Sequence, residues 1–331
     1  MSCLSTPPIS NREFLHQLIT DLSGPTGVSE ITTNLVNYSR IFVPDCLYRY
    51  RECGKPHSFS DIENGCLTLT SPSEFDDVDD TTIHDIGAME RMAATIIEEK
   101  DLSFEMLRNY ISVFESAMGD QASELLSYAE HTRNMSRSER KQAIENLTKQ
   151  IKAHVDVSQA NEALRRQQRV ACLSENDNSE YMWKHYGGNG TGYLIEYESR
   201  NLFGIDLLNK KLPLILPVIY TDSLPDTFLL PVALAVETSL RDTIGEKFVG
   251  GLLAINLVKC IFYKRIAPYI AEEEWRLMLP PHESERTDVR IFRPAKPSRV
   301  IAGDNMSHQD RQKLIECAKL YDIAVDERAY R

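Results

Sequence analysis

The chain of 331 residues lacks several features that would place it outside a cell or across a membrane. Its longest apolar runs, such as 212–218, contain proline and fall far short of the roughly 20 residues that a membrane helix needs. The first residues, MSCLSTPPISNREF, have neither the basic flank nor the apolar stretch of a secretion signal. Seven cysteines occur without a CxxC pair, which favours reduced thiols over a disulfide framework or a zinc site. These absences predict a cytoplasmic protein with no membrane contact.

The chain also lacks an excess of positive charge, since its formal net charge is -12. Most nucleic-acid binders carry a basic surface that neutralises phosphates, so general nucleic-acid binding is not expected. The sequence contains no internal repeat and no low-complexity tract. A hydrophobic content of 42% in a chain of this length is enough for a full core.

The pattern of helix and strand signals predicts an N-terminal helical extension followed by one domain. Residues 1–45 read as two helices, the first opened by the capping-box pair Ser10 and Glu13. Residues 46–331 form a single α+β domain in this interpretation. Within it, 86–168 returns to helical spacing, with a second capping box at Ser136 and Glu139.

Period-two alternation predicts a sheet assembled from distant segments. The expected strands are 46–52, 66–71, 170–175, 191–198, 216–222, 273–280 and 298–304. The fold class is therefore α+β, with a mixed or antiparallel central sheet. The helical insertion falls between the second and third strands, and we expect it to pack on the sheet or its rim, because isolated helices gain most of their stability from packing.

The first predicted strand, LYRYR, places Arg49 and Arg51 on one face and Tyr48 and Tyr50 on the other. Arginines at the centre of a sheet are suited to hold an anionic ligand. The alternative is an edge strand whose arginines are solvated or paired with nearby acids, which is the common state of arginine.

A late segment, AEEEWRLML, places Glu272, Glu274 and Arg276 on one face if it is a strand. Two carboxylates and a guanidinium on a partly buried face orient one another and shift their pKa values. A solvated acidic face is the alternative.

The window from Ser174 to Tyr197 holds Trp183, Tyr186 and four glycines beside several other aromatic residues. Glycine lets a backbone approach a ligand closely, although GGNG is also compatible with a plain turn. An acidic run, FDDVDD at 75–80, precedes a helical segment, and the helix dipole explains it more simply than a metal does. No metal site is therefore predicted.

The order LYRYR with NGCLTLTSPSEFDD, then SENDNSEYMWKHYGGNGTGYLIEY, then EEEWRLML resembles the bacterial domain of unknown function 2971 family. The similarity spans most of 46–325, apart from the insertion. Two positions depart from the family pattern: Arg49 stands where many relatives carry His, and Asp76 stands where Asn is usual.

The same order of motifs is similar in layout to the NAD-dependent ADP-ribosyltransferases. That resemblance implies NAD as the substrate, with Glu274 on its ribose and Glu272 and Ser174 beside it. It implies that Arg49 and Arg51 hold the adenosine or pyrophosphate part of this small nucleotide ligand. Tyr48, Trp183 and Tyr186 would complete the cofactor-binding set, the last two by stacking on a ring. We then expect the side chains of Arg49, Ser174 and Glu274 to converge on one cleft.

Two other function classes remain compatible with the sequence. A metal-dependent hydrolase or nuclease would use Asp76, Asp77 and Asp79 together with Glu272 or Glu274. A non-catalytic module would sense a ligand or dock a protein partner. For the transferase, the acceptor stays open between a macromolecule, protein or nucleic acid, and a small molecule. The biological role stays open between a bacterial toxin, a phage-defence effector and a housekeeping factor.

Overall fold

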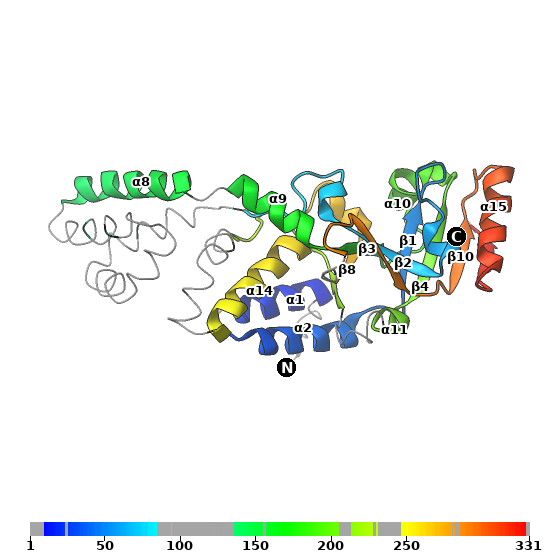
Figure 1. Ribbon diagram of the computed structural model, residues 1–331, viewed down its shortest axis with the longest axis horizontal. Helices are drawn as coiled ribbons and strands as arrows, with labels where there is room; N and C mark the ends of the chain where they lie inside the picture. Colours follow the sequence, from blue (N-terminus) through cyan, green and yellow to red (C-terminus); the bar gives the residue numbers. More distant parts are fainter. Residues whose placement is uncertain are drawn as a thin grey trace, which may run out of the picture.

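A computed structural model describes residues 10–23, 26–84, 136–154, 157–204, 213–227, 246–279 and 285–328, with a few single positions between them. The molecule is elongated, with helix α8 (Arg137–His154) at one end and helix α15 (His308–Lys319) at the other (Figure 1). The sheet lies between these ends, so the α+β class predicted from the sequence is confirmed.

The described residues form a nine-stranded sheet and a separate two-stranded one. Along the main path the order is β11-β10-β4-β1-β3-β2-β9, and β8 joins β3 to β5. The strands of the large sheet are β1 (Cys46–Arg51), β2 (Cys66–Thr70), β3 (Val170–Ser174), β4 (Tyr193–Glu198), β5 (Leu214–Pro217), β8 (Glu274–Met278), β9 (Arg290–Pro294), β10 (Arg299–Ala302) and β11 (Ala324–Glu327). All its pairings are antiparallel except that of β10 with β11, so the sheet is mixed.

Strand β3 connects two parts of the large sheet, and it pairs unequally with its neighbours on the two sides. Strand β1 pairs with β4 over six residues but meets β3 at a single pair, Tyr48 with Ser174. Strand β2 likewise meets β3 only through Thr70 and Val170. By contrast, β3 pairs with β8 over its whole length. The segments that carry the predicted site residues therefore lie on adjacent strands, in the order β1, β3, β8.

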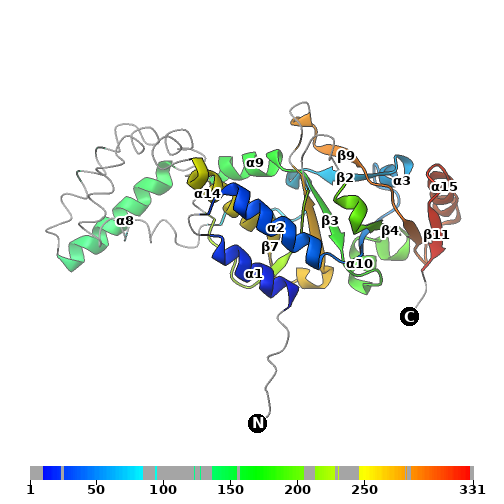
Figure 2. The ribbon, with the colours of Figure 1, turned by 90° about the horizontal axis from the view of Figure 1, so that it is seen from below.

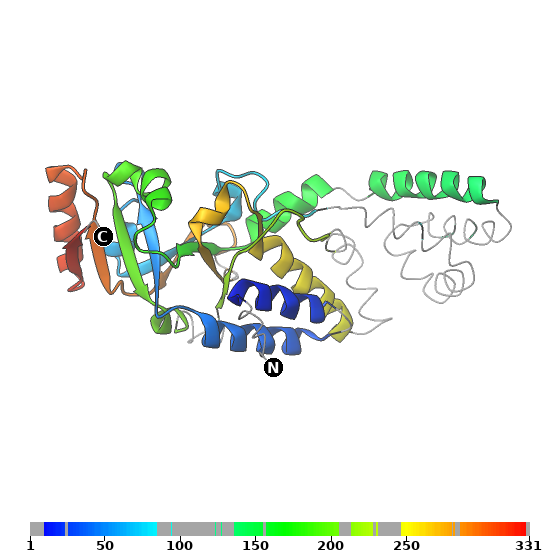
Figure 3. The same ribbon diagram turned by 180° about the vertical axis from the view of Figure 1, so that it is seen from behind.

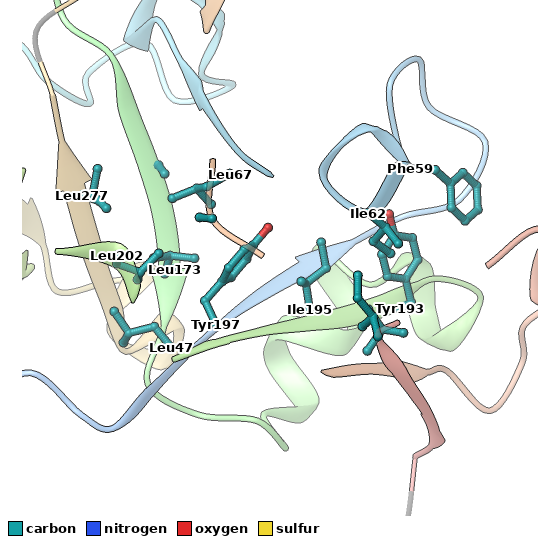
Figure 4. Close-up of a cluster of buried hydrophobic side chains, with 14 of the residues drawn as sticks. Leu47, Phe59, Ile62, Leu67, Leu173, Tyr193, Ile195, Tyr197, Leu202 and Leu277 are labelled. Atoms are coloured by element: carbon teal, nitrogen blue, oxygen red, sulfur yellow. The ribbon is translucent and has the colours of Figure 1, made fainter. Parts of the chain in front are cut away.

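The largest hydrophobic core of the described residues lies on one face of this sheet, where its buried side chains surround β1 and β4 (Figure 4). Leu47, Ile195 and Tyr197 come from these two strands, while Leu173 and Leu277 come from β3 and β8. These alternate residues of each strand point the same way, as the period-two pattern predicts. Helix α15 covers the far part of this core through Leu314 and Ala318.

The second core lies around the N-terminal helices, α1 (Asn11–Asp21) and α2 (Val28–Phe42). They lie side by side with helix α14 (Glu246–Phe262), as Figures 2 and 3 show from two sides. Leu15, Ile19, Ile31 and Leu35 are buried there against residues of α14 and β5. The two predicted N-terminal helices thus exist, and they supply part of the molecule's buried core.

Both predicted capping boxes are confirmed by hydrogen bonds, and a third helix is capped by a serine. Ser10 and Glu13 exchange the two bonds of a capping box at the start of α1. Ser136 and Glu139 do the same before α8. Ser307 accepts a bond from the backbone of Asp310 at the start of α15. These bonds satisfy backbone N–H groups that the first turn of a helix leaves without a partner.

The described part of the predicted insertion consists of α8 and α9 (Val157–Gln167). Helix α9 packs on the sheet's rim, because Arg165 donates to the carbonyl of Pro72 in the short helix η1 (Pro72–Glu74). Helix α8 extends away from the sheet (Figures 1 and 2). The rest of the predicted insertion, including Met92, Ile96 and Leu107, lies outside the described residues.

Strand prediction failed at three short segments. Strands β7 (Tyr263–Arg265), β9 and β11 were not predicted, and the predicted strand 216–222 is two strands, β5 and β6 (Ile219–Thr221). Strands β6 and β7 form the small parallel sheet. Strands β6, β7 and β11 have only three or four residues, which is too short to show a period. No helix in the described ranges has both the length and the apolar character needed to span a bilayer.

Candidate functional site

The acidic segment at the start of β8 enters the sheet from a short helix, η4 (Tyr269–Glu272). Glu273 joins the two elements in the left-handed conformation, with φ of 46°. A non-glycine residue rarely adopts this conformation, and it costs of order 1 kcal/mol or more. The turn places Glu272 and Glu274 on the same side of the chain, where both reach the side chain of Lys264.

Arg276 is the centre of a buried network of charged side chains, and it is 0% exposed. Its Nη1 and Nη2 atoms bind the two oxygens of Asp80 at 2.7 and 2.6 Å. Its Nε and Nη2 atoms bind the two oxygens of Glu274 at 2.8 and 3.1 Å. A further bond from Nη1 to the carbonyl of Ile261 engages the last of the five guanidinium N–H groups. The guanidinium is fully satisfied and therefore fixed in place.

Lys264, on β7, brings the third carboxylate into the network. Its ammonium lies 2.8 Å from Glu272, 3.5 Å from Glu274 and 3.6 Å from Asp80. The ring of Tyr269 lies on another side of it, with its centroid 4.1 Å away. The lysine thus occupies the position between carboxylates that a bound cation would take. The three carboxylates and two cations together carry one net negative charge when all are ionised.

Glu272 connects this network to the protein surface. One of its carboxylate oxygens accepts a 2.6 Å bond from the hydroxyl of Tyr186, whose residue is 41% exposed. Its backbone carbonyl accepts a 2.8 Å bond from Ser174, which is almost fully buried. Glu272 itself is 3% exposed. The Tyr186 hydroxyl therefore joins the buried carboxylate of Glu272 to a side chain at the protein surface.

The two glutamates have opposite electrostatic environments. Burial and the charge of Glu274 raise the pKa of Glu272 above its ordinary value, and Lys264 only partly offsets them. Burial also acts to raise the pKa of Glu274, but Arg276 and Lys264 overcome it and lower that pKa to about 2. Adjacent carboxylates whose pKa values are driven apart are typical of functional sites. Glu274 stays ionised, whereas Glu272 is the group that exchanges a proton more easily.

The strand register aligns one residue from each of three strands. Tyr48 on β1 is opposite Ser174 on β3, and Ser174 is opposite Glu274 on β8. Residues directly opposite one another point to the same face of a sheet. The predicted grouping of Ser174 with Glu272 and Glu274 is therefore present in the structure, and Tyr48 lies in the same row.

Arg49 does not join this row, so the expectation that Arg49 and Glu274 converge on one cleft is wrong. Arg49 follows Tyr48 in the strand and therefore points to the opposite face. There Arg49 and Arg51 bind the same oxygen of Asp61 at 3.2 and 2.9 Å. Asp61 is 0% exposed, and its other oxygen accepts two bonds from Thr68. This geometry agrees with the alternative considered from the sequence, in which the two arginines pair with a nearby acid and do not hold a ligand.

Trp183 does not offer its ring for stacking, because it is 2% exposed. It lies in a small core with Tyr50, Leu194 and Ile301, and the guanidinium of Arg328 covers its ring at 4.9 Å. This packing anchors helix α10 (Glu180–His185), which ends at Tyr186. Trp183 therefore acts on the site only through the position of Tyr186.

The acidic run FDDVDD contributes a residue other than those considered from the sequence. Asp76 and Asp79 are exposed, and Asp77 is half-buried. Asp80 is the buried member, at 6% exposure, and it binds Arg276. The predicted hydrolase set of Asp76, Asp77 and Asp79 is not assembled with Glu272 and Glu274. In the described part of the chain no group of three or more potential ligands is arranged to hold a metal ion.

Sequence reasoning also missed Lys264, which belongs to a strand of three residues directly after an apolar helix. Its only signal is a lysine placed immediately after the long apolar run of α14. Its partners are 8, 10 and 184 positions away, so no local spacing reveals them.

Comparison of the chain with family models, with curated proteins and with solved structures found no match in any of the three.

Proposed function

We propose that the protein transfers the ADP-ribosyl group of NAD to an acceptor, with Glu272 as the carboxylate that meets the nicotinamide ribose. The observation that carries this proposal is the pair of glutamates at the start of β8, with pKa values moved in opposite directions. The row of Tyr48, Ser174 and Glu274 across three strands supports it, because it joins the first, middle and last sequence motifs.

The reaction breaks the bond between the ribose carbon and the nicotinamide nitrogen, and the electron pair leaves with nicotinamide. Positive charge then develops on the ribose, and a nearby carboxylate stabilises it. The acceptor atom forms the new bond to the same carbon and releases a proton. The raised pKa of Glu272 suits it to take that proton.

Glu274, which was expected on the ribose from the sequence, has a positioning role in this proposal instead, because Arg276 engages both of its oxygens. Both of its oxygens are bound to Arg276, and Lys264 lies near one of them. It therefore holds the lysine that in turn holds Glu272. Tyr186 covers the site in the absence of substrate, and its ring would lie against the bound nicotinamide or ribose after rotation.

The first prediction tests this activity directly. Purified full-length protein is incubated with NAD labelled in nicotinamide, with and without cell lysate, and free nicotinamide is measured. Glu272→Gln should lower the rate at least about 100-fold, since removing one transition-state contact costs this much in other enzymes. Glu273→Gln is the matched control, because this neighbour lies outside the network and its carboxylate accepts a bond from Asn176.

The proposal requires that the wild-type protein release nicotinamide above the buffer rate and that, in a parallel sample with NAD labelled in its adenine, the label reach an acceptor from the lysate. If the wild type is inactive under both conditions, the transferase proposal is wrong. Release that continues unchanged in folded Glu272→Gln would also overturn it. Circular dichroism and a melting curve establish that each variant is folded.

A further inference from the structure

A cavity of about 550 Å³ lies on the far side of two segments that build the ion network. Its walls come from 73–84, from helix α9 and from β7. They include Phe75, Asp79, His84, Glu162, Arg166 and Arg265. This volume falls within the range of roughly 300 to 1,000 Å³ that small-molecule sites occupy.

The cavity and the ion network share adjacent residues but use different side chains. Asp80 and Lys264 bind within the network, while their neighbours Asp79 and Arg265 line the cavity. Phe75 also lines the cavity, and its ring centroid lies 6.0 Å from the guanidinium carbon of Arg276. The cavity therefore presents side chains other than those of the network, and Glu272 is not among its lining residues.

The three arginines that line the cavity differ in how many guanidinium N–H groups remain available to a ligand. Arg165 donates to the carbonyls of Pro72, Asp77 and Val78, so it shapes the wall. Arg166 forms a 2.7 Å ion pair with Glu162. Arg265 is exposed, and no carboxylate or carbonyl of the described residues engages its guanidinium. Arg265 is therefore the cation with donors to spare for a phosphate.

The rest of the cavity wall supplies an aromatic ring and a hydrogen-bond acceptor. Phe75 is half-buried and presents an aromatic side chain to the cavity. Asp79 is exposed at the wall, and its carboxylate is suited to accept bonds from sugar hydroxyls. Burial and the charge of Arg265 lower the pKa of His84, so this histidine adds no fixed charge at neutral pH. A ligand with a phosphate, a sugar and an aromatic ring matches this set.

We propose that this cavity binds a nucleotide, with its phosphate on Arg265 and its base against Phe75. The proposal rests on residues that the proposed transferase step does not use. A nucleotide bound there would contact Asp79 and Arg265 and so stabilise the two segments that carry Asp80 and Lys264.

The test measures binding of ADP to the full-length protein by isothermal titration calorimetry. Arg265→Gln should weaken ADP binding about tenfold or more, as expected for the loss of a charge-assisted contact. Phe75→Leu should weaken ADP binding but leave binding of inorganic phosphate unchanged. The matched control is Arg200→Gln, which removes an exposed arginine of helix α11 (Ser199–Leu202), away from the cavity wall.

A second arm separates this cavity from the site at Glu272. Glu272→Gln should bind ADP as tightly as the wild type, since Glu272 does not line the cavity. ADP binding that is unchanged in both Arg265→Gln and Phe75→Leu would place the nucleotide outside this cavity and overturn the proposal. The absence of saturable ADP binding to the wild type in the millimolar range would overturn it as well.

Discussion

The two faces of the central sheet each bury a cluster of charged side chains, and the clusters have opposite charge balance. At β8, three carboxylates share two cations. At β1, two guanidiniums, of Arg49 and Arg51, share the single carboxylate of Asp61. The first cluster reaches the surface through exposed Tyr186, whereas the second lies beside the large hydrophobic core.

The difference between the two clusters shows that the type of residue in a strand does not by itself indicate a ligand site. Arg49 and Arg51 have the residue types expected for an anion site, yet Asp61 neutralises one of their charges, and its pKa is lowered although burial alone would raise it. Glu272 keeps a raised pKa despite its contact with Lys264. The acidic cluster therefore keeps a group poised to react, while the basic cluster links β1 to helix α3 (Ser60–Glu63).

The largest effect is expected from removing the centre of the acidic cluster. Arg276→Met should destabilise the protein by roughly 3 to 5 kcal/mol, because it leaves Asp80 and Glu274 buried without their main partner. Urea unfolding at neutral pH measures this change. A loss below about 1 kcal/mol would mean that the network contributes little to the folded state.

A somewhat smaller effect is expected from the basic cluster. Asp61→Asn should cost roughly 3 kcal/mol, since it leaves the buried guanidinium of Arg49 and the partly exposed one of Arg51 without their counter-charge. Nicotinamide release per folded molecule should stay at the wild-type level, because Asp61 lies on the opposite face from Glu272. A selective loss of activity with unchanged stability would instead place a ligand at Arg49 and Arg51.

The next effect concerns Glu274 and depends on pH. Glu274→Gln should lower stability at neutral pH by roughly 1.5 to 3 kcal/mol, through weaker bonds to Arg276. The folded pKa of about 2 is below the ordinary value of 4.5. The stabilisation by ionised Glu274 is therefore complete above pH 4.5 and is lost as the pH falls toward 2.

Unfolding curves of the wild type and Glu274→Gln, measured between pH 4.5 and 2, test whether stability falls with pH in this way. The wild type should lose more stability than the variant as the pH falls, so the two curves should approach each other. Parallel curves would show that Glu274 is not held ionised by Arg276. On a solvated strand face, the alternative considered from the sequence, the same substitution would change stability very little.

The smallest effect on stability is expected at the exposed end of the acidic cluster. Tyr186→Phe removes the hydroxyl bond to Glu272 and should cost less than about 1 kcal/mol. That bond helps to lower the pKa of Glu272, so its loss should raise this pKa further. The acidic limb of the pH profile for nicotinamide release should then move to higher pH. An unchanged profile would separate Glu272 from the activity.

Local patterns were sufficient to predict several parts of the fold. The capping boxes at Ser10 and Ser136 form as predicted, because each depends on residues three positions apart. The alternation in LYRYR places Arg49 and Arg51 together on one face, as the geometry of a strand requires. The grouping of Glu272, Glu274 and Arg276 was likewise predicted, although it depends on the left-handed turn at Glu273 as well as on alternation.

The sequence by itself determined which side chains of one strand share a face, since that follows from the local backbone. Only the tertiary structure decided which face of β1 is turned toward β8, because this depends on the register of Tyr48 with Ser174 across 126 positions. It also decided the partners of the charges: Asp80 and Lys264 meet Arg276 and Glu272 through contacts between distant segments. Burial sets the pKa values of such groups, and burial is a property of the whole packed chain.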